Sequence, residues 1–106
     1  MDITFLYFED CPSHDTALNR LKSILAEEGI EAPIEVIKVE TDEAAQTHQF
    51  VGSPTIRLNG EDMVPPEPDA MYGLMCRAYR REDGRISPLP THETIRHAIR
   101  AKLKHT

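Results

Sequence analysis

The pattern of apolar and polar residues predicts two strands and two helices in the first half of the chain. Residues 2–8 form a nearly continuous apolar run rich in β-branched and aromatic side chains, which is typical of a central strand covered on both faces. Residues 13–28 repeat apolar positions one helical turn apart, which predicts an amphipathic helix. Residues 34–39 carry charges within an apolar run and therefore fit an edge strand. A threonine followed by two acids then opens a short helix over residues 41–49.

The second half contains one clear hairpin and one ambiguous stretch. Residues 55–58 predict a third strand, and the Asn-Gly pair at 59–60 is typical of a tight turn into an antiparallel strand. Prolines crowd residues 61–73, which we interpret as an irregular insertion because proline cannot join a central strand. The apolar residues 74–79 are the best candidate for the fourth strand, and residues 63–64 are the alternative.

The chain closes with a third helix, and the order of elements defines the fold class. Residues 91–103 carry an apolar stripe after a capping threonine. The predicted order is β-α-β-α-β-β-α. A helical crossover makes the first two strands parallel, and the hairpin makes the last two antiparallel. We therefore expect an α/β fold with a four-stranded mixed sheet flanked by helices, in a single domain spanning residues 1–106.

Composition and charge limit which binding partners and which cellular compartment we expect for the protein. The net charge of -6 argues against a nucleic-acid partner, because phosphate binding draws on clustered Lys and Arg. No secretion signal and no apolar run of membrane-spanning length is visible, so we expect a cytoplasmic protein without membrane contact. A chain of 106 residues folds without the help of a cofactor, and we expect none. Two cysteines far apart in sequence do not resemble a secreted disulfide framework.

Cys11 is the residue most suited to chemistry. It follows the first strand, and we expect Asp10 or Cys11 to cap the next helix with Pro12 at its first position. Ligands of α/β sheets bind at such strand ends, and a helix N-terminus stabilises a thiolate. His14 lies one turn along the same face and is expected to pair with the thiolate or move a proton, while Glu9 and Asp10 oppose the charge. We therefore predict a moderately lowered thiol pKa. The alternatives are a buried structural Cys11 and a solvated or capping His14.

Two short motifs resemble those of thioredoxin-like proteins. Residues 11–14, Cys-Pro-Ser-His, stand where that superfamily has its Cys-x-x-Cys site, with His14 in place of the second cysteine. Ser53-Pro54-Thr55 resembles the proline loop that faces the site. The resemblance implies a thioredoxin-like fold with a cis Ser53–Pro54 bond, which presents the backbone of residue 53 to an extended peptide. The expected substrate-binding residues are those of the two loops: Pro12, Ser53, Pro54 and Thr55. A trans proline opening an edge strand is the alternative.

A closer resemblance is to a group of small bacterial thioredoxin-like proteins. It is carried by residues 7–12, 52–56 and 76–79, which read Tyr-Phe-Glu-Asp-Cys-Pro, Gly-Ser-Pro-Thr-Ile and Cys-Arg-Ala-Tyr. Some relatives are described as related to alkylmercury lyase. The chain departs from the group at Pro88, where many members have glycine, so the approach to the last helix is expected to differ.

The role of Cys76 depends on which segment forms the fourth strand. If residues 74–79 form it, Cys76 lies too far from Cys11 for a disulfide, which needs Cα atoms within ~7 Å. The favoured interpretation is then a buried structural cysteine in an apolar context. If residues 63–64 form the strand instead, Cys76 approaches Cys11 as a resolving or second thiol, or as a second metal ligand.

Three functions fit these residues. The leading hypothesis is a monothiol-type thiol–disulfide oxidoreductase, in which Cys11 forms a mixed disulfide that an external thiol or Cys76 resolves. Its partner is a thiol or disulfide, carried by a protein or a small molecule. The second is a non-catalytic adaptor that holds a partner at the proline loop. The third is a soft-metal or organomercurial binding protein with Cys11, His14 and Cys76 as ligands.

Overall fold

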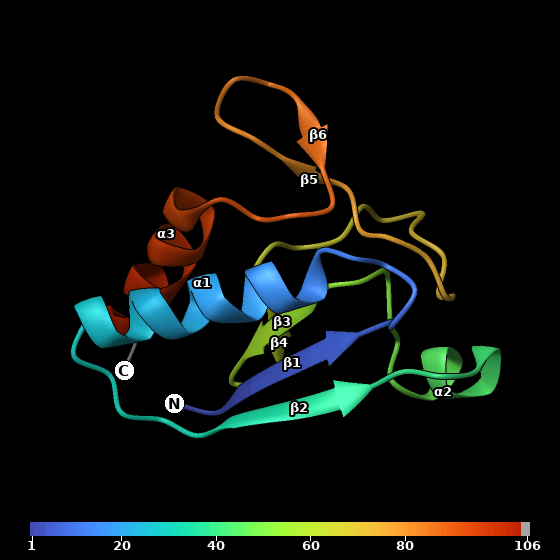
Figure 1. Ribbon diagram of the computed structural model, residues 1–106, viewed down its shortest axis with the longest axis horizontal. Helices are drawn as coiled ribbons and strands as arrows, with labels where there is room; N and C mark the ends of the chain where they lie inside the picture. Colours follow the sequence, from blue (N-terminus) through green and yellow to red (C-terminus); the bar gives the residue numbers. More distant parts are fainter. Residues whose placement is uncertain (105–106) are drawn as a thin grey trace.

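The computed structural model describes residues 1–104 and contains three helices and six short strands (Figure 1). Residues 105–106 of the predicted domain lie outside the described part. The elements in chain order are β1 (Ile3–Tyr7), α1 (His14–Glu27), β2 (Ile34–Lys38), α2 (Asp42–Thr47), β3 (Thr55–Leu58), β4 (Glu61–Asp62), β5 (Tyr79–Arg80), β6 (Ile86–Ser87) and α3 (His92–Leu103). Thr41 and Thr91 cap α2 and α3 with their hydroxyls, as the sequence predicts.

A four-stranded mixed sheet forms the centre of the molecule, in the order β2-β1-β3-β4. β1 pairs parallel with β2 and antiparallel with β3, so that Phe5 lies between Val36 and Ile56. This confirms the predicted mixed α/β architecture, with the first strand inside the sheet and the second at its edge. The crossover through α1 makes β1 and β2 parallel, whereas β3 runs in the opposite direction beside β1.

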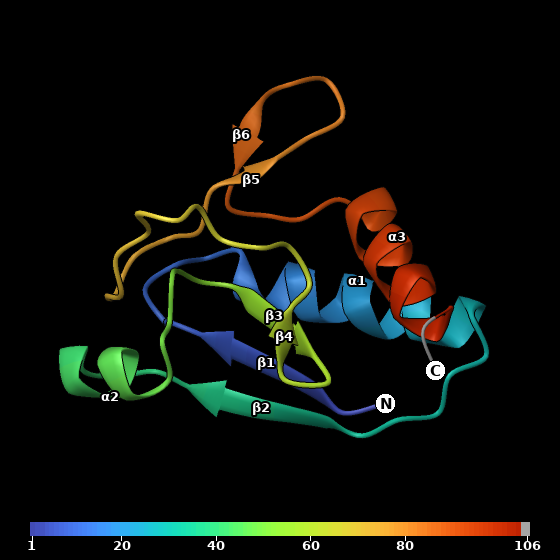
Figure 2. The same ribbon diagram turned by 180° about the vertical axis from the view of Figure 1, so that it is seen from behind.

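Helices cover the two faces of the sheet unequally. α1 and α3 lie side by side on one face, where the apolar stripes of both helices meet alternate residues of β1 and β3 (Figures 1 and 2). The other face carries a smaller cluster around Leu6, Val39, Ala45 and Phe50, to which α2 contributes. In both views α2 lies beyond the carboxyl ends of β1 and β2. That end of the sheet is therefore the place where loops from several elements meet.

The fourth strand was wrongly predicted at residues 74–79. The hairpin at Asn59 and Gly60 leads directly into β4, which pairs Asp62 with Arg57 of β3. Prolines stop the strand after the next backbone hydrogen bond, from Met63 N–H to the Ile56 carbonyl. Residues 74–78 instead cross the end of the sheet, and β5 pairs with β6 in a separate small hairpin that the sequence did not predict.

The start of α1 also differs from the prediction. The helix begins at His14 after Ser13, whose side chain makes no capping hydrogen bond. Pro12 therefore precedes the helix in a turn instead of opening it, and neither Asp10 nor Cys11 is the cap residue. The turn begins with a hydrogen bond from the Cys11 N–H to the Phe8 carbonyl, and residues 8–13 separate β1 from α1. No helix within residues 1–104 has the length and apolar character needed to cross a membrane.

Candidate functional site

The two cysteines are joined in a disulfide at the carboxyl end of β1. The Cα atoms of Cys11 and Cys76 lie 5.7 Å apart, although the residues are 65 positions apart in sequence. Cys11 is buried, with 1% of its surface exposed, whereas Cys76 is exposed. The favoured interpretation of Cys76 as a buried cysteine remote from Cys11 is therefore wrong, because residues 74–78 cross the site instead of extending the sheet. The alternative is confirmed in bringing the two cysteines together, although the fourth strand is residues 61–62 and not 63–64.

The turn after β1 and the proline loop hold Cys11 from two sides. The Ser53 hydroxyl accepts a hydrogen bond of 2.9 Å from the Phe8 N–H, which ties the end of the β1 run to the loop before β3. The Ser53 carbonyl oxygen lies 3.5 Å from the Cys11 sulfur. The Ser53–Pro54 peptide bond is cis, as the resemblance implied. Cys11 is thus buried between the loop that follows β1 and the loop that precedes β3.

Residues 75–77 pair with the backbone of Ser53. The Ser53 N–H donates to the Met75 carbonyl at 2.7 Å, and the Arg77 N–H donates to the Ser53 carbonyl at 2.8 Å. Together they form an isolated parallel bridge between Ser53 and Cys76. The resemblance to thioredoxin-like proteins implied that these Ser53 groups would face an external peptide. In this oxidised structure the chain's own segment takes them, and Ser53, Pro54 and Thr55 are all buried.

Glycine at position 52 allows this segment to approach. Gly52 has φ +131°, a conformation that residues with side chains rarely adopt. A Cβ atom at this position would lie 2.8 Å from the Arg77 Cα and 2.9 Å from the Arg77 backbone nitrogen. The close contact is between two backbones, so neither side can turn away by a change of rotamer. Gly52 therefore sets how near residues 75–77 can come to Ser53.

A buried ion pair anchors the segment from the other side. The Arg77 guanidinium donates to the Asp62 carboxylate at 2.7 Å and to the Val64 carbonyl at 2.6 Å, with only 6% of Arg77 exposed. Its charge also lies over the Tyr79 ring, 4.9 Å from the ring centre. Burial raises the pKa of Asp62 above its usual value, although Arg77 opposes that effect. The pair thus joins β4 to the residue next to Cys76.

Tyr79 completes the anchor at β5. It is buried, and its hydroxyl donates to the Pro54 carbonyl at 2.5 Å. Burial raises the pKa of Tyr79, so the phenol stays protonated and keeps this hydrogen bond. Sequence reasoning noted residues 76–79 as part of a family pattern but gave Arg77 and Tyr79 no role. An arginine and a tyrosine spaced two apart beside a cysteine were the available signal.

His14 has partners other than Cys11. Its ring stacks on Tyr7 with 4.5 Å between ring centres, and its Nδ1 atom lies 3.3 Å from the Asp15 carboxylate. No hydrogen bond or ion pair joins it to Cys11 in the described chain, so its part in the chemistry stays a prediction. The Glu9 carboxylate pairs with Lys38 at 2.7 Å, and this hydrogen bond lowers the pKa of Glu9. Lys38 thereby offsets one of the two negative charges expected to oppose a thiolate.

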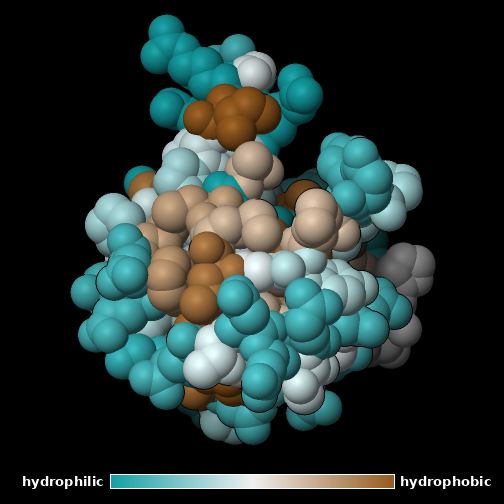
Figure 3. All heavy atoms as spheres, turned by 90° about the vertical axis from the view of Figure 1, so that its right-hand side faces the viewer, coloured by the Kyte–Doolittle hydropathy of each residue, from teal (hydrophilic) through white to brown (hydrophobic). Residues whose placement is uncertain are grey.

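Exposed apolar side chains precede Cys76 in the chain. Met71, Tyr72 and Met75 are exposed, Met71 by 77%. Two hydrogen bonds hold the backbone of this stretch to the body of the protein, from Gln46 to the Tyr72 carbonyl and from Gly73 to the Phe50 carbonyl. Figure 3 shows hydrophobic and pale residues gathered on this end of the molecule, bordered by hydrophilic ones.

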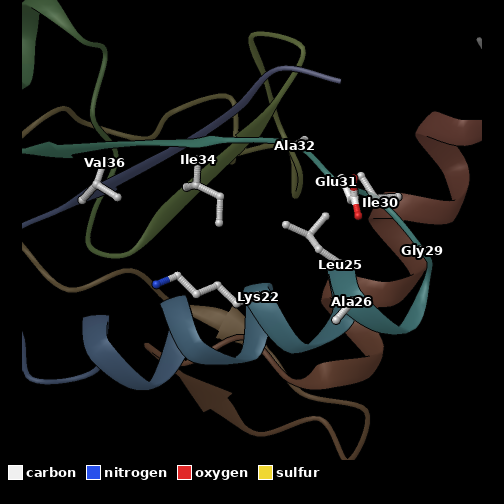
Figure 4. Close-up of a pocket in the computed structure, with 9 residues that line it drawn as sticks. All are labelled: Lys22, Leu25, Ala26, Gly29, Ile30, Glu31, Ala32, Ile34 and Val36. Carbon is white, nitrogen blue, oxygen red and sulfur yellow. The ribbon is translucent and has the colours of Figure 1, made fainter.

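A groove lies away from the cysteines, between α1 and β2. Lys22 and Leu25 of α1 face Ile34 and Val36 of β2 across a groove (Figure 4). None of the predicted site residues lines it. Within residues 1–104 no group of three His, Cys, Asp or Glu side chains is placed to hold an ion, and two of the three suggested ligands, Cys11 and Cys76, are joined in the disulfide. The suggested ligand set of Cys11, His14 and Cys76 stays a hypothesis.

Comparisons of the chain with protein-family models, curated proteins and solved structures find no match. The arrangement of the two cysteines and of the segments that hold them is therefore the basis for any functional assignment.

Proposed function

We propose that this protein is a thiol–disulfide exchange protein of the thioredoxin-like class and that its working group is the Cys11–Cys76 disulfide. The observation that carries the proposal is the position of that disulfide. One of its cysteines is buried at the end of a central strand, and the other is exposed on a crossing segment. A disulfide that external thiols reach at the carboxyl end of a sheet suits exchange better than a disulfide enclosed in a core.

Three features support the thioredoxin-like assignment. A cysteine lies between β1 and α1, and a cis proline immediately before β3 faces it. The strand order, with parallel β1–β2 and antiparallel β1–β3 and β3–β4 pairs, agrees with the arrangement expected from the motifs. The separate β5–β6 hairpin lies outside the predicted order of elements.

With the Cys11–Cys76 disulfide, the proposed exchange uses two thiols of the protein instead of the single Cys11 thiol expected from the sequence. When this protein is reduced, two external thiols together lose two electrons and form a disulfide with each other. The Cys11–Cys76 bond then becomes two thiols. In the reverse direction the dithiol protein reduces an external disulfide. Cys76 thus supplies the internal second thiol that the Cys-Pro-Ser-His motif lacks. No cofactor is required for either direction, and the co-reactant is a thiol or disulfide on a protein or a small molecule.

The test is a redox titration. The protein is equilibrated with mixtures of reduced and oxidised glutathione, quenched in acid and alkylated, and its oxidised fraction is measured by mass. We expect a reduction potential between roughly -180 and -270 mV, the range of disulfide-exchange proteins. Catalysed reduction of a model disulfide should be slower in both Cys11→Ser and Cys76→Ser than in the wild-type protein. A potential below about -300 mV, as structural disulfides have, together with no catalysis, would leave the adaptor as the remaining hypothesis.

A further inference from the structure

The two sulfurs of the disulfide differ in how an incoming thiol can reach them. Cys11 is 1% exposed and lies beneath the proline loop, with the Ser53 carbonyl oxygen 3.5 Å from its sulfur. Cys76 is exposed and belongs to a segment that crosses the surface. In disulfide exchange the attacking, central and leaving sulfurs lie in line, so each sulfur is attacked from the side opposite its partner. For Cys11 that side is the buried body of the protein, whereas for Cys76 it is the side away from the buried cysteine.

We propose that exchange begins at Cys76, with Cys11 as the leaving and resolving thiol; this inference rests on the proposed function. An external thiolate forms a bond to the Cys76 sulfur while the Cys11–Cys76 bond breaks. Cys11 leaves with the electron pair and takes up a proton from water. A second external thiolate then attacks the mixed disulfide at the external sulfur, which releases an external disulfide and the Cys76 thiolate. Two external thiols are oxidised, and one protein disulfide is reduced.

The same roles hold when the protein acts as a reductant. The Cys76 thiolate attacks an external disulfide, releases one external thiolate and carries the other half as a mixed disulfide. The Cys11 thiolate then attacks the Cys76 sulfur, reforms the internal disulfide and releases the second external thiolate. The sequence predicted that Cys11, in the loop after β1, would be the thiol that attacks the external disulfide. The structure gives that position to the resolving step because its cysteine is the one that substrates do not reach.

The surroundings of each sulfur fit these roles. The segment that leads to Cys76 exposes the side chains of Met71, Tyr72 and Met75, which offer apolar contacts to the molecule that carries the incoming thiol. Around Cys11, the Ser53 carbonyl is placed to accept a hydrogen bond from the released thiol, which keeps Cys11 beside Cys76 for the return step. A resolving thiol gains from such confinement, because its attack is intramolecular and needs no access from solvent.

The position of the mixed disulfide tests the proposal in the unmodified protein. Oxidised protein is mixed with glutathione for a series of short times, quenched in acid, blocked with excess N-ethylmaleimide and digested with trypsin. The sequence places Cys11 in the peptide of residues 1–20 and Cys76 in the peptide of residues 58–77. We expect glutathione on peptide 58–77 at the earliest times. Glutathione first on peptide 1–20 would overturn the assignment of roles while leaving exchange itself intact.

A pair of variants gives a second measurement. Cys11→Ser keeps only Cys76, and Cys76→Ser keeps only Cys11, with circular dichroism as the control for folding. We expect Cys11→Ser to form a mixed disulfide with oxidised glutathione at least about tenfold faster, because exposure controls thiol exchange. A faster reaction of Cys76→Ser would overturn the inference. If the disulfide of the oxidised wild-type protein also stays intact in glutathione, the proposed function fails as well. Glutathione found first on peptide 1–20 would instead overturn only the roles of the two cysteines.

Discussion

Replacing Gly52 with alanine should make the Cys11–Cys76 disulfide easier to reduce. The new Cβ atom would lie 2.8 Å from the Arg77 Cα and 2.9 Å from the Arg77 nitrogen, inside van der Waals contact with backbone atoms. In the oxidised protein the neighbouring Cys76 is tied to Cys11, so the segment cannot move away without strain. In the reduced protein that tie is absent, and residues 75–77 can withdraw from Ser53. The substitution therefore penalises the oxidised state more than the reduced one.

The size of the effect follows from the contacts that the clash removes. Withdrawal breaks two backbone hydrogen bonds, Ser53 to Met75 and Arg77 to Ser53, each worth about 1 kcal/mol net. The oxidised form has to give up these bonds or carry an equivalent strain, whereas a reduced form whose segment is already released from Ser53 loses nothing further, so the difference between the two states is about 2 kcal/mol. A difference of that size shifts the redox equilibrium toward the dithiol roughly 30-fold. Positive φ at Gly52 adds a strain of about 1–3 kcal/mol to both states, which lowers overall stability.

Gly60→Ala is the matched control for this measurement. Gly60 also has positive φ, at +83°, but a Cβ atom there meets nothing within 4 Å. It therefore carries the backbone strain without the clash. Both variants are equilibrated with glutathione mixtures, and urea unfolding reports their stability. We expect both to lose stability and only Gly52→Ala to shift the redox equilibrium. An equal shift in the two variants, or none in Gly52→Ala, would refute the idea that Gly52 sets the approach of the Cys76 segment.

Three further substitutions test the anchors of the site and of the last helix. Arg77→Met leaves the buried Asp62 without its cation and should destabilise the protein by about 3–5 kcal/mol near neutral pH. Because burial already raises the pKa of Asp62, its carboxyl becomes neutral as pH falls, so urea unfolding of Arg77→Met should show a loss that shrinks toward acid pH; a loss independent of pH would contradict this. Tyr79→Phe removes the donor to the Pro54 carbonyl and should cost about 1–3 kcal/mol in the same assay, whereas no change would show that the bond contributes nothing. Thr91→Ala removes the cap of α3 and should cost about 1 kcal/mol, measured by thermal unfolding.

Local patterns in the sequence were enough to predict most of the sheet and its helices. The apolar run of residues 2–8, the helical periodicity of 13–28 and the Asn-Gly pair at 59–60 each act over a few residues, so their meaning is fixed by neighbours in the chain. They predicted β1, α1, β3 and the turn into an antiparallel strand, but not which residues form that strand. The position of Cys11 at the end of β1 followed from the same patterns.

The course of residues 61–79 could not be predicted in this way, because tertiary contacts determine it. The apolar string at 74–79 resembles a strand, yet Met75 points to the surface and Arg77 is buried against Asp62. A buried arginine is favourable only beside a carboxylate that the sequence alone does not place. The pairing of Cys76 with Cys11 depended on this path, and so it stayed open between two alternatives until the fold was known.

The parallel bridge between Ser53 and Cys76 has a consequence for competition at the proline loop. Any external strand that seeks the Ser53 backbone must displace a segment of the same molecule, whose effective concentration as a tethered ligand is of millimolar order. While the disulfide is intact, the displaced segment also remains covalently attached beside the loop. In the oxidised protein, a weakly binding peptide would therefore compete with residues 75–77 for this backbone. Cleavage of one covalent bond converts that internal competitor into a strand that can dissociate.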